Sequence, residues 1–347
     1  MEAVNRMRVD EAAEVFERHR SYLLGVAYRL TGSWADAEDA VADAWLRWSR
    51  HADGVQEPRG WLTRVVGRIA LDQLRSARAR HEVYVGPWLP EPIVTSVDAP
   101  ATTADPRSGD PVDAVLWDES VRMAFLVVID QLTPEQRLAV VLHDAAGLDF
   151  NEVAEVLGCS AAAARQHGSR GRHRLDVAKV PPRAPVGEVW AVLGELSVAL
   201  QSGDTDRLAA LLAPDVVLTG DGGGKVAAAR RPLVGAEVAR FLHGLVSRFA
   251  GLAQLQVALV NGEPGFVLRV DSDRPQDAKL AVYSFVVRAG RIEALYGVLA
   301  PDKVGRVPPP EDLTGPEDLA GLVTPSPAGP VSAAPTRLPR SSTPLPS

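Results

Sequence analysis

The residues of this chain best suited to contacting a partner lie between positions 160 and 175, where cations alternate with hydrogen-bonding side chains and no acidic residue occurs. Guanidinium groups neutralise phosphates, and both Arg and Gln side chains can hydrogen-bond base edges in the major groove of DNA. The residues that carry these groups are Arg165, Gln166, His167, Ser169, Arg170, Arg172, His173 and Arg174. We interpret the segment as a DNA-reading helix; the alternative is a solvated basic face.

The residues before this segment predict the first helix of a helix-turn-helix. Asp149 can cap a helix, and Glu152, three residues later, can complete a capping box. Apolar residues then follow at the i, i+3, i+4 spacing of a core-facing stripe. Gly158 suits the turn, and Ser160 can accept backbone N–H groups at the start of the second helix.

A second basic segment covers residues 59–80, which hold six Arg against the single Asp72. We predict a helix over residues 61–80 with Trp61 at its start. Cations beside an aromatic ring can hold a nucleic-acid backbone and stack on an unpaired base. The alternative for Trp61 is an anchor in the apolar core.

An acidic helix is predicted from about Ser33 onward. Its outer face holds four carboxylates, on Asp36, Glu38, Asp39 and Asp43, and Trp45 lies on its apolar face. A run of charge is usually a solvated face, so this segment alone does not distinguish solvent from a partner protein.

Composition limits the remaining possibilities. The 347 residues carry a net charge of −7, but this average hides the two basic segments, and local patches determine nucleic-acid binding. A single cysteine, Cys159, excludes a disulfide framework and a Cys-based zinc site. We expect Cys159 to be a small packed residue in the turn between the two helices.

The N-terminal residues lack the apolar region of a signal peptide. No apolar run approaches the roughly 20 residues that span a bilayer. We therefore expect a cytoplasmic protein with no membrane partner.

Proline distribution divides the chain into five segments. We expect a helical unit at residues 1–85, a Pro-rich linker at 86–112, a second, independently folded helical unit at 113–180 and an α+β domain at 185–303. A disordered Pro-rich tail is expected at 304–347, where eleven prolines occur without an aromatic residue.

The α+β domain is predicted from helices at residues 189–200, 207–212 and 235–249. Strands are expected from 215, and over 252–260, 265–270, 280–288 and 292–299. This order suits a curved sheet wrapped by helices, which could enclose an enzymatic pocket. Candidate polar lining residues are Asp221, His243, Tyr283 and Tyr296.

Three segments together resemble bacterial sigma factors. They are YRLTGSWADAEDAVADAWLRWSR at residues 28–50, EPRGWLTRVVGRIALDQLR at 57–75, and the stretch from LTPEQRLAVVLHD to GRHRL at 132–175. Their order resembles regions 2 and 4 of extracytoplasmic-function (ECF) sigma factors of the sigma-70 family. The resemblance implies a multidomain fold, with two all-α sigma domains and a C-terminal α+β cone of the SnoaL/NTF2-like type.

Three short motifs resemble the ECF subgroup with that C-terminal extension: WLPEP at 88–92, DGGGK at 221–225 and APDKV at 300–304. The subgroup usually has Asn and Leu at the ends of the last motif, where this chain has Ala300 and Val304. The resemblance implies a regulatory contact between the extension and the sigma domains. Its expected residues are Trp88, Pro90, Asp221, Gly222, Gly223, Gly224, Lys225, Asp302 and Lys303. For the three glycines, a mere surface turn is the alternative.

The resemblance also implies partners for the helices. Asp36, Glu38, Asp39, Asp43 and Trp45 would dock on the β′ clamp helices of core RNA polymerase, and the β flap would be a further polymerase contact. Trp61, Arg64, Arg68, Asp72 and Arg75 would open and hold the −10 promoter element. Arg165, Gln166, Ser169, Arg170 and Arg172 would bind the −35 element.

We therefore expect a sigma factor, tuned in cis by its extension, with no catalytic residue, metal or cofactor of its own. The extension would take either a small-molecule ligand or an intramolecular contact. One alternative is a DNA-binding repressor or activator that never joins the polymerase, for which the acidic helix would have no role. Another is a small-molecule enzyme with a DNA-binding appendage.

Overall fold

The computed structural model describes residues 2–81, 84–97, 121–178 and 180–313. Residues 98–112 of the expected linker, the first residues of the second helical unit and the Pro-rich tail from residue 314 lie outside the described residues. Within the described ranges, no helix is long and apolar enough to cross a membrane.

The N-terminal unit consists of three helices, α1 (Glu2–Thr31), α2 (Trp34–His51) and α3 (Pro58–His81). Helix α2 begins where the sequence predicts, because the Ser33 hydroxyl accepts a hydrogen bond from the Asp36 amide at 3.2 Å. Its buried residues recur at helical spacing and face α1 and α3; they are Trp34, Ala37, Ala40, Val41, Ala44 and Trp48.

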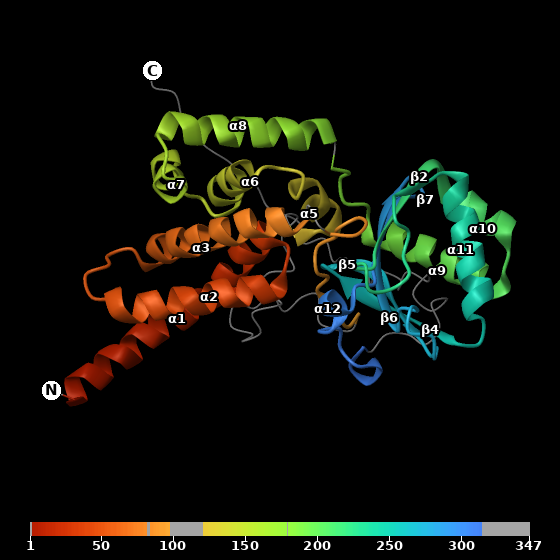
Figure 1. Ribbon diagram of the computed structural model, residues 1–347, viewed down its shortest axis with the longest axis horizontal. Helices are drawn as coiled ribbons and strands as arrows, with labels where there is room; N and C mark the ends of the chain where they lie inside the picture. The colour runs from red at the N-terminus through yellow and green to blue at the C-terminus, as the bar shows by residue number, and fades with distance from the viewer. Residues whose placement is uncertain (1, 82–83, 98–120, 179, 314–347) are drawn as a thin grey trace, which may run out of the picture.

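The second helical unit contains α5 (Met123–Ile129), α6 (Pro134–Val140), a π-helical turn (Val141–Ala145), α7 (Phe150–Leu157) and α8 (Ala161–Ala178). Figure 1 shows α3 lying beside α6 and α7, with α8 along the outer edge. The elements that carry the predicted DNA-binding residues therefore belong to one helical body.

The two helical units share one apolar core, which differs from the expectation of independently folded units. Leu62 and Val66 of α3 belong to the same buried cluster as Leu142. A Cβ built on Gly67 would lie 2.9 Å from Leu142, so the glycine permits the close approach. The apolar residues of α3 are therefore covered by α1 and α2 on one side and by the second unit on the other.

The C-terminal domain begins with α9 (Val186–Ser202) and α10 (Thr205–Leu211) and includes α11 (Ala236–Phe249). Its strands are β2 (Leu212–Asp221), β3 (Leu233–Val234), β4 (Ala253–Val260), β5 (Glu263–Val270), β6 (Leu280–Arg288) and β7 (Arg291–Val298). The expected helices and the four last strands are present, with bounds that differ by no more than three residues. Strand β2 is longer than expected, and it pairs with β7 in parallel.

The linker contributes an edge strand, β1 (Val94–Thr95), to this sheet, whose strand order is β1-β4-β5-β6-β7-β2-β3. Val94 pairs with Val260 in an antiparallel register. The linker is therefore built into the C-terminal domain and does not merely span the distance between two units.

Both faces of the sheet are covered. Helices α9, α10 and α11 lie on the outer side in Figure 1, and the helical body lies on the other. Because side chains alternate along a strand, Tyr283 of β6 joins the core beneath α9 and α11, whereas its neighbour Val282 joins a core with Leu89 of the linker and Met123 of α5. The predicted architecture, two helical units plus an α+β domain, is confirmed.

Asn261 connects all the parts of the chain at one buried point. It sits with Gly262 in the two-residue turn between β4 and β5, and both residues have positive φ, 53° and 75° respectively. Its side-chain oxygen accepts a hydrogen bond from the Ile93 amide at 3.1 Å. Its Nδ2 donates to the Tyr28 hydroxyl at 2.7 Å and to the Val121 carbonyl at 2.8 Å.

We expect Asn261→Ala to lower the free energy of unfolding by about 3 kcal/mol, because it leaves several buried donors and acceptors without partners. Urea unfolding followed by tryptophan fluorescence measures this loss. Asn151→Ala, at an exposed position of α7, is the matched control and should change stability little. Equal stabilities of the two variants would contradict this view of the junction.

Candidate functional site

The turn between α7 and α8 is built as its residues predict. Asp149 Oδ1 accepts hydrogen bonds from the Asn151 and Glu152 amides at 2.7 and 2.9 Å, and the Asp149 amide donates to Glu152 Oε2 at 3.0 Å. Gly158 ends α7 with φ of 67°, in the left-handed region that glycine favours. The Ser160 hydroxyl accepts from the Ala163 amide at 3.2 Å and starts α8.

Helix α8 has one face without large side chains, which packs on α6 and α7. A Cβ on Gly171 would lie 2.6 Å from Val140, and a Cβ on Gly168 would lie 3.1 Å from Phe150. The opposite face is exposed and presents four of the five residues predicted to bind the −35 element. These residues are Arg165, Gln166, Ser169 and Arg170.

The fifth predicted residue, Arg172, forms an ion pair with Asp144, with 2.9 Å between Nη1 and Oδ1. It therefore sits beside the π-helical turn and not in the row formed by Arg165, Gln166 and Ser169. Both members of the pair are more than a third exposed, so the pair contributes little to stability.

The expectation that Cys159 is a packed residue is wrong, because its side chain is exposed. The chain turns outward between Gly158 and Ser160, and the apolar positions of α7 before the turn already fill the local core.

The acidic face of α2 divides into two parts. Asp39 and Asp43 are exposed, whereas Asp36 and Glu38 are half-buried. Trp45 packs on Phe16 of α1, with 5.1 Å between ring centroids. The carboxylates therefore form a surface above a firmly packed aromatic pair.

The basic residues of α3 face the second helical unit. Arg64 pairs with Glu152 of α7 at 2.6 Å, and Arg75 pairs with Glu135 of α6 at 3.1 Å. Arg68 donates to the Glu155 carbonyl at 2.6 Å.

The other two predicted residues of α3 have different surroundings. Trp61 is half-buried against Trp48, with ring centroids 5.6 Å apart, and Asp72 is exposed. The five residues predicted to bind the −10 element thus share one helix, but three of them are held by acidic or carbonyl groups of the second helical unit.

The buried carboxylate of Asp221 joins the C-terminal domain to the linker. One of its oxygens accepts hydrogen bonds from the Tyr84 hydroxyl at 2.6 Å and the Gly223 amide at 3.0 Å. The other accepts from the Leu89 amide at 2.9 Å and from Lys303 Nζ at 2.7 Å. Four donors compensate a carboxylate that is 0% exposed. We call Tyr84, Leu89, Asp221 and Lys303 the lock.

Lys303 lies in α12 (Pro301–Val304), close to the end of the described chain. Its ammonium group also donates to the Leu89 carbonyl at 2.6 Å and stands 4.1 Å from the centroid of the Trp88 ring. Burial lowers the pKa of Lys303, and the neighbouring Asp221 opposes that shift. Burial also raises the pKa of Tyr84, and its hydrogen bond to Asp221 acts in the same direction.

The linker lies directly on the turn between α1 and α2. A Cβ on Gly32 would lie 2.9 Å from Trp88 and 3.7 Å from Pro90. The next residue, Glu91, accepts hydrogen bonds from the Trp34 amide at 2.8 Å and the Ser33 hydroxyl at 3.2 Å. Glu91 therefore caps the N-terminus of α2, where a negative charge is favourable, although burial raises its pKa.

Arg306, just after α12, reaches the acidic face of α2. Its guanidinium group pairs with Glu38 at 2.5 Å and lies 3.8 Å from Glu91. The C-terminal segment thus forms an ion pair with Glu38, one of the carboxylates predicted to face the polymerase.

The three glycines form a tight turn against the lock. Gly223 and Gly224 have φ of 64° and 69°, and a Cβ on Gly222 would lie 2.5 Å from the Val226 carbonyl oxygen. Lys225 pairs with Asp302 at 3.4 Å, but both side chains are exposed. Of the residues expected at the regulatory contact, Asp221 and Pro90 are buried, and Trp88 and Lys303 are half-buried beside Asp221.

The four candidates for polar lining residues of one pocket do not meet. Asp221 belongs to the lock, His243 is exposed on α11, and Tyr296 packs on the face of the sheet that covers the linker. Of the four, Tyr283 lines a large cavity of the C-terminal domain. The expectation that all four residues line one pocket is therefore wrong for Asp221, His243 and Tyr296.

Sequence reasoning missed Tyr84, Glu91, Asn261 and Arg306. The dipeptide Asn261–Gly262 predicts a hairpin turn, but nothing local indicates that the Asn side chain reaches the helical body. The contacts of Arg306 join residues 268 positions apart in the chain. Only the assembled structure brings such residues together.

Comparisons with known proteins agree with this arrangement. The model of Sigma-70 region 2 matches residues 15–80, and that of Sigma-70, region 4 matches residues 122–175. The chain is 45% identical over 299 residues to the ECF RNA polymerase sigma factor SigJ of Mycobacterium tuberculosis, covering 83% of this chain and 91% of that protein.

A second curated relative, the probable ECF RNA polymerase sigma factor SigI of the same species, is 32% identical over 208 residues, covering 60% of this chain and 69% of that protein. Among solved structures, the crystal structure of the M. tuberculosis extracytoplasmic function sigma factor SigJ matches with a TM-score of 0.68 at 42% identity. That match covers 84% of this chain and 98% of the other.

We expect Asp221→Asn to loosen the lock, because it leaves the buried ammonium group of Lys303 without its counter-charge. Losing one partner of a buried ion pair costs about 3–5 kcal/mol, so amide hydrogen exchange in residues 84–97 and 300–313 should accelerate by about 100-fold or more. Asp302→Asn, which removes an exposed carboxylate next to Lys303, is the control and should have little effect. Unchanged exchange in Asp221→Asn would refute the lock.

Proposed function

Because this chain belongs to the ECF family of RNA polymerase sigma factors, we propose that it joins core polymerase through α2 and recognises promoters through α3 and α8. It is a sigma factor that directs transcription initiation with RNA polymerase, and the surfaces it uses are our proposal. The observation that supports these surfaces is that one chain exposes both an acidic face on α2 and a cationic row on α8.

The acidic face of α2 is suited to the β′ clamp helices. Asp39 and Asp43 are exposed, Asp36 and Glu38 flank them, and Trp45 is fixed from below by Phe16. A carboxylate surface on a rigid helix favours a basic partner surface and fixes its orientation. The second helical unit would contact the β flap.

The exposed row of α8 is suited to the major groove at the −35 element. Arg165, Gln166 and Arg170 can each hydrogen-bond base edges or phosphates, and each good bidentate base contact discriminates by about 1–3 kcal/mol. Arg172 would reach a phosphate only after leaving Asp144.

The −10 contacts require a change of arrangement. Arg64, Arg68 and Arg75 of α3 are engaged with α6 and α7, so they can bind a DNA strand only when α3 separates from the second helical unit. Trp61 and Asp72 would then complete the surface that holds an unpaired base. We therefore propose that polymerase binding opens the helical body.

The C-terminal domain would tune this opening in cis. The lock holds the linker on the turn before α2, and Arg306 pairs with Glu38 on the surface proposed for β′. Polymerase and the C-terminal segment would compete for this carboxylate. Pro90 and the Gly222–Gly224 turn contribute by allowing the close fit of the linker.

Run-off transcription on fragmented genomic DNA tests the proposed function, with core polymerase alone and with the full chain added. We expect new transcript starts that share one pair of promoter elements. The double variant Asp39→Lys, Asp43→Lys should reduce them at least tenfold, because it reverses the charge of the surface that meets β′.

Asp206→Lys, on the exposed surface of α10, is the matched control and should retain full output. A chain that binds DNA but produces no polymerase-dependent start would favour a repressor. Unchanged output from the double variant would contradict the role of α2.

We expect Arg306→Ala to raise transcription from the full chain by up to about fivefold at limiting core polymerase. An exposed ion pair contributes up to about 1 kcal/mol, and its loss frees Glu38. The measurement is transcript yield against core concentration, with Arg291→Ala of the exposed β7 end as control. An unchanged or lower yield would contradict competition at α2.

A further inference from the structure

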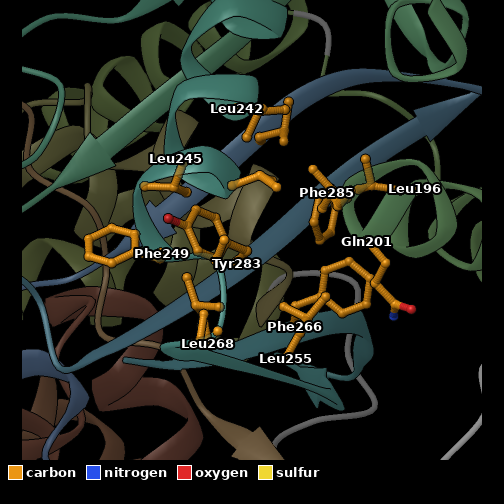
Figure 2. Close-up of a pocket in the computed structure, with 16 residues that line it drawn as sticks. Leu196, Gln201, Leu242, Leu245, Phe249, Leu255, Phe266, Leu268, Tyr283 and Phe285 are labelled. Atoms are coloured by element: carbon orange, nitrogen blue, oxygen red, sulfur yellow. The ribbon is translucent and has the colours of Figure 1, made fainter. Parts of the chain in front are cut away.

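A cavity of about 350 Å³ lies in the C-terminal domain between α9, α11 and the sheet. Figure 2 shows side chains from both helices and from the strands converging on it. Phe266 and Phe285 meet edge to face with centroids 5.4 Å apart, and Leu295 lies fully buried beside them. Gln201 and Gly251, both exposed, lie at the open side. The volume falls in the range of small-molecule sites.

The lining is almost entirely apolar. Leu, Val, Phe and Ala predominate, and only Gln201 and Tyr283 bring polar side-chain groups among the described lining residues. The Gln201 amide nitrogen donates to the Ser197 hydroxyl at 3.1 Å, which leaves its oxygen as an acceptor near the open side. No group in this lining carries a charge at neutral pH.

Tyr283 supplies the inner polar group. Its ring is 8% exposed, and its hydroxyl lies toward Leu245 and Phe249 in Figure 2. Burial raises the pKa of Tyr283 to about 12, and no described residue hydrogen-bonds the hydroxyl. The residue lines the cavity, so its hydroxyl can pair with a ligand there.

A second cavity of about 340 Å³ adjoins the first, and both are lined by Leu245, Phe249, Leu268 and Tyr283. Arg248 lies in the second cavity, where it pairs with the buried carboxylate of Asp277. An acid entering there would compete with this ion pair, whereas an uncharged molecule leaves it intact.

The Tyr283 ring also lies close to the lock. A Cβ on Gly297 of β7 would lie 2.7 Å from the ring, so the ring rests directly on that strand. Gly297 pairs with Gly220 of β2, and the next residue of β2 is Asp221. The amides of Leu299 and Ala300, which follow β7, donate to the Asp221 carbonyl at 2.7 and 2.9 Å.

We propose that this cavity is a binding site for an uncharged, largely apolar small molecule with one hydrogen-bonding group that meets the Tyr283 hydroxyl. An ionised ligand would have to lose its hydration against a lining without a counter-charge, which disfavours it. As an input to transcription the site rests on the proposed regulation in cis, because Tyr283 pairs with Gly297 of β7, which pairs with Gly220, the residue before Asp221 on β2. Binding itself does not depend on that regulation.

Two fluorescent probes that differ by one charge test the proposal on the full chain, without polymerase. N-Phenyl-1-naphthylamine is uncharged and apolar, and 8-anilino-1-naphthalenesulfonate carries the same rings with a sulfonate. We expect the uncharged probe to bind with at least tenfold higher affinity than the sulfonate. Leu245→Trp, which fills the cavity, should lower the affinity for the uncharged probe at least tenfold. Leu252→Trp, at an exposed position outside the lining, should leave that affinity unchanged.

Tyr283→Phe is the second variant, because it preserves the ring and loses only the hydroxyl. It should weaken binding of the uncharged probe several-fold, as expected for one hydrogen bond. Equal binding by the Leu245→Trp and Leu252→Trp chains would overturn the site, and tighter binding of the sulfonate would overturn the ligand class. Because these titrations contain neither polymerase nor DNA, a failed transcription assay and a failed binding assay remain distinguishable.

Discussion

The arrangement of the chain depends on one buried carboxylate, that of Asp221. An ionised group removed from water is tolerated only when donors surround it, and here the donors come from three separate segments. Tyr84 and Leu89 belong to the segment between α3 and β1, Gly223 to the glycine turn and Lys303 to α12. Any movement of one segment away from the others exposes the charge to an incomplete set of partners, so the segments stay together or separate together.

The same constraint connects the α+β domain physically to the helical body. The linker is bound on one side by β4 and the lock, and on the other side by the turn between α1 and α2. Glu91 in the linker caps α2, so the same segment that contacts the C-terminal domain also stabilises the start of the acidic helix. The shared core of α3 and the second helical unit extends this connection to both basic helices.

Much of the local structure follows from the sequence. The caps at Ser33 and Asp149, the turn at Gly158 and the strand pattern of residues 252–299 are set by neighbours within a few residues. The general rules of helix capping and of alternating side chains along a strand are enough to predict these features. The motif resemblance also indicated that Trp88, Asp221 and Lys303 belong to one contact.

The remaining features depend on how the parts meet, which no local pattern encodes. Arg64 and Arg75 are typical of a nucleic-acid surface in the sequence, yet they find acidic partners on helices more than 50 residues away. The apolar residues of α3 predict that part of the helix is buried without saying which helices cover it. Asn261 and Arg306 lie in a turn and near the end of the described chain, and their long-range partners became visible only in the assembled fold.

Helix α12 lies near the end of the described chain, so it is synthesised after the other elements that it contacts. A ribosome completes α2, α3 and α8 long before it reaches Lys303 and Arg306, and domains generally fold as they emerge. During that interval the helices have no lock to hold them. Until Lys303 has emerged, the carboxylate of Asp221 therefore lacks its ammonium partner.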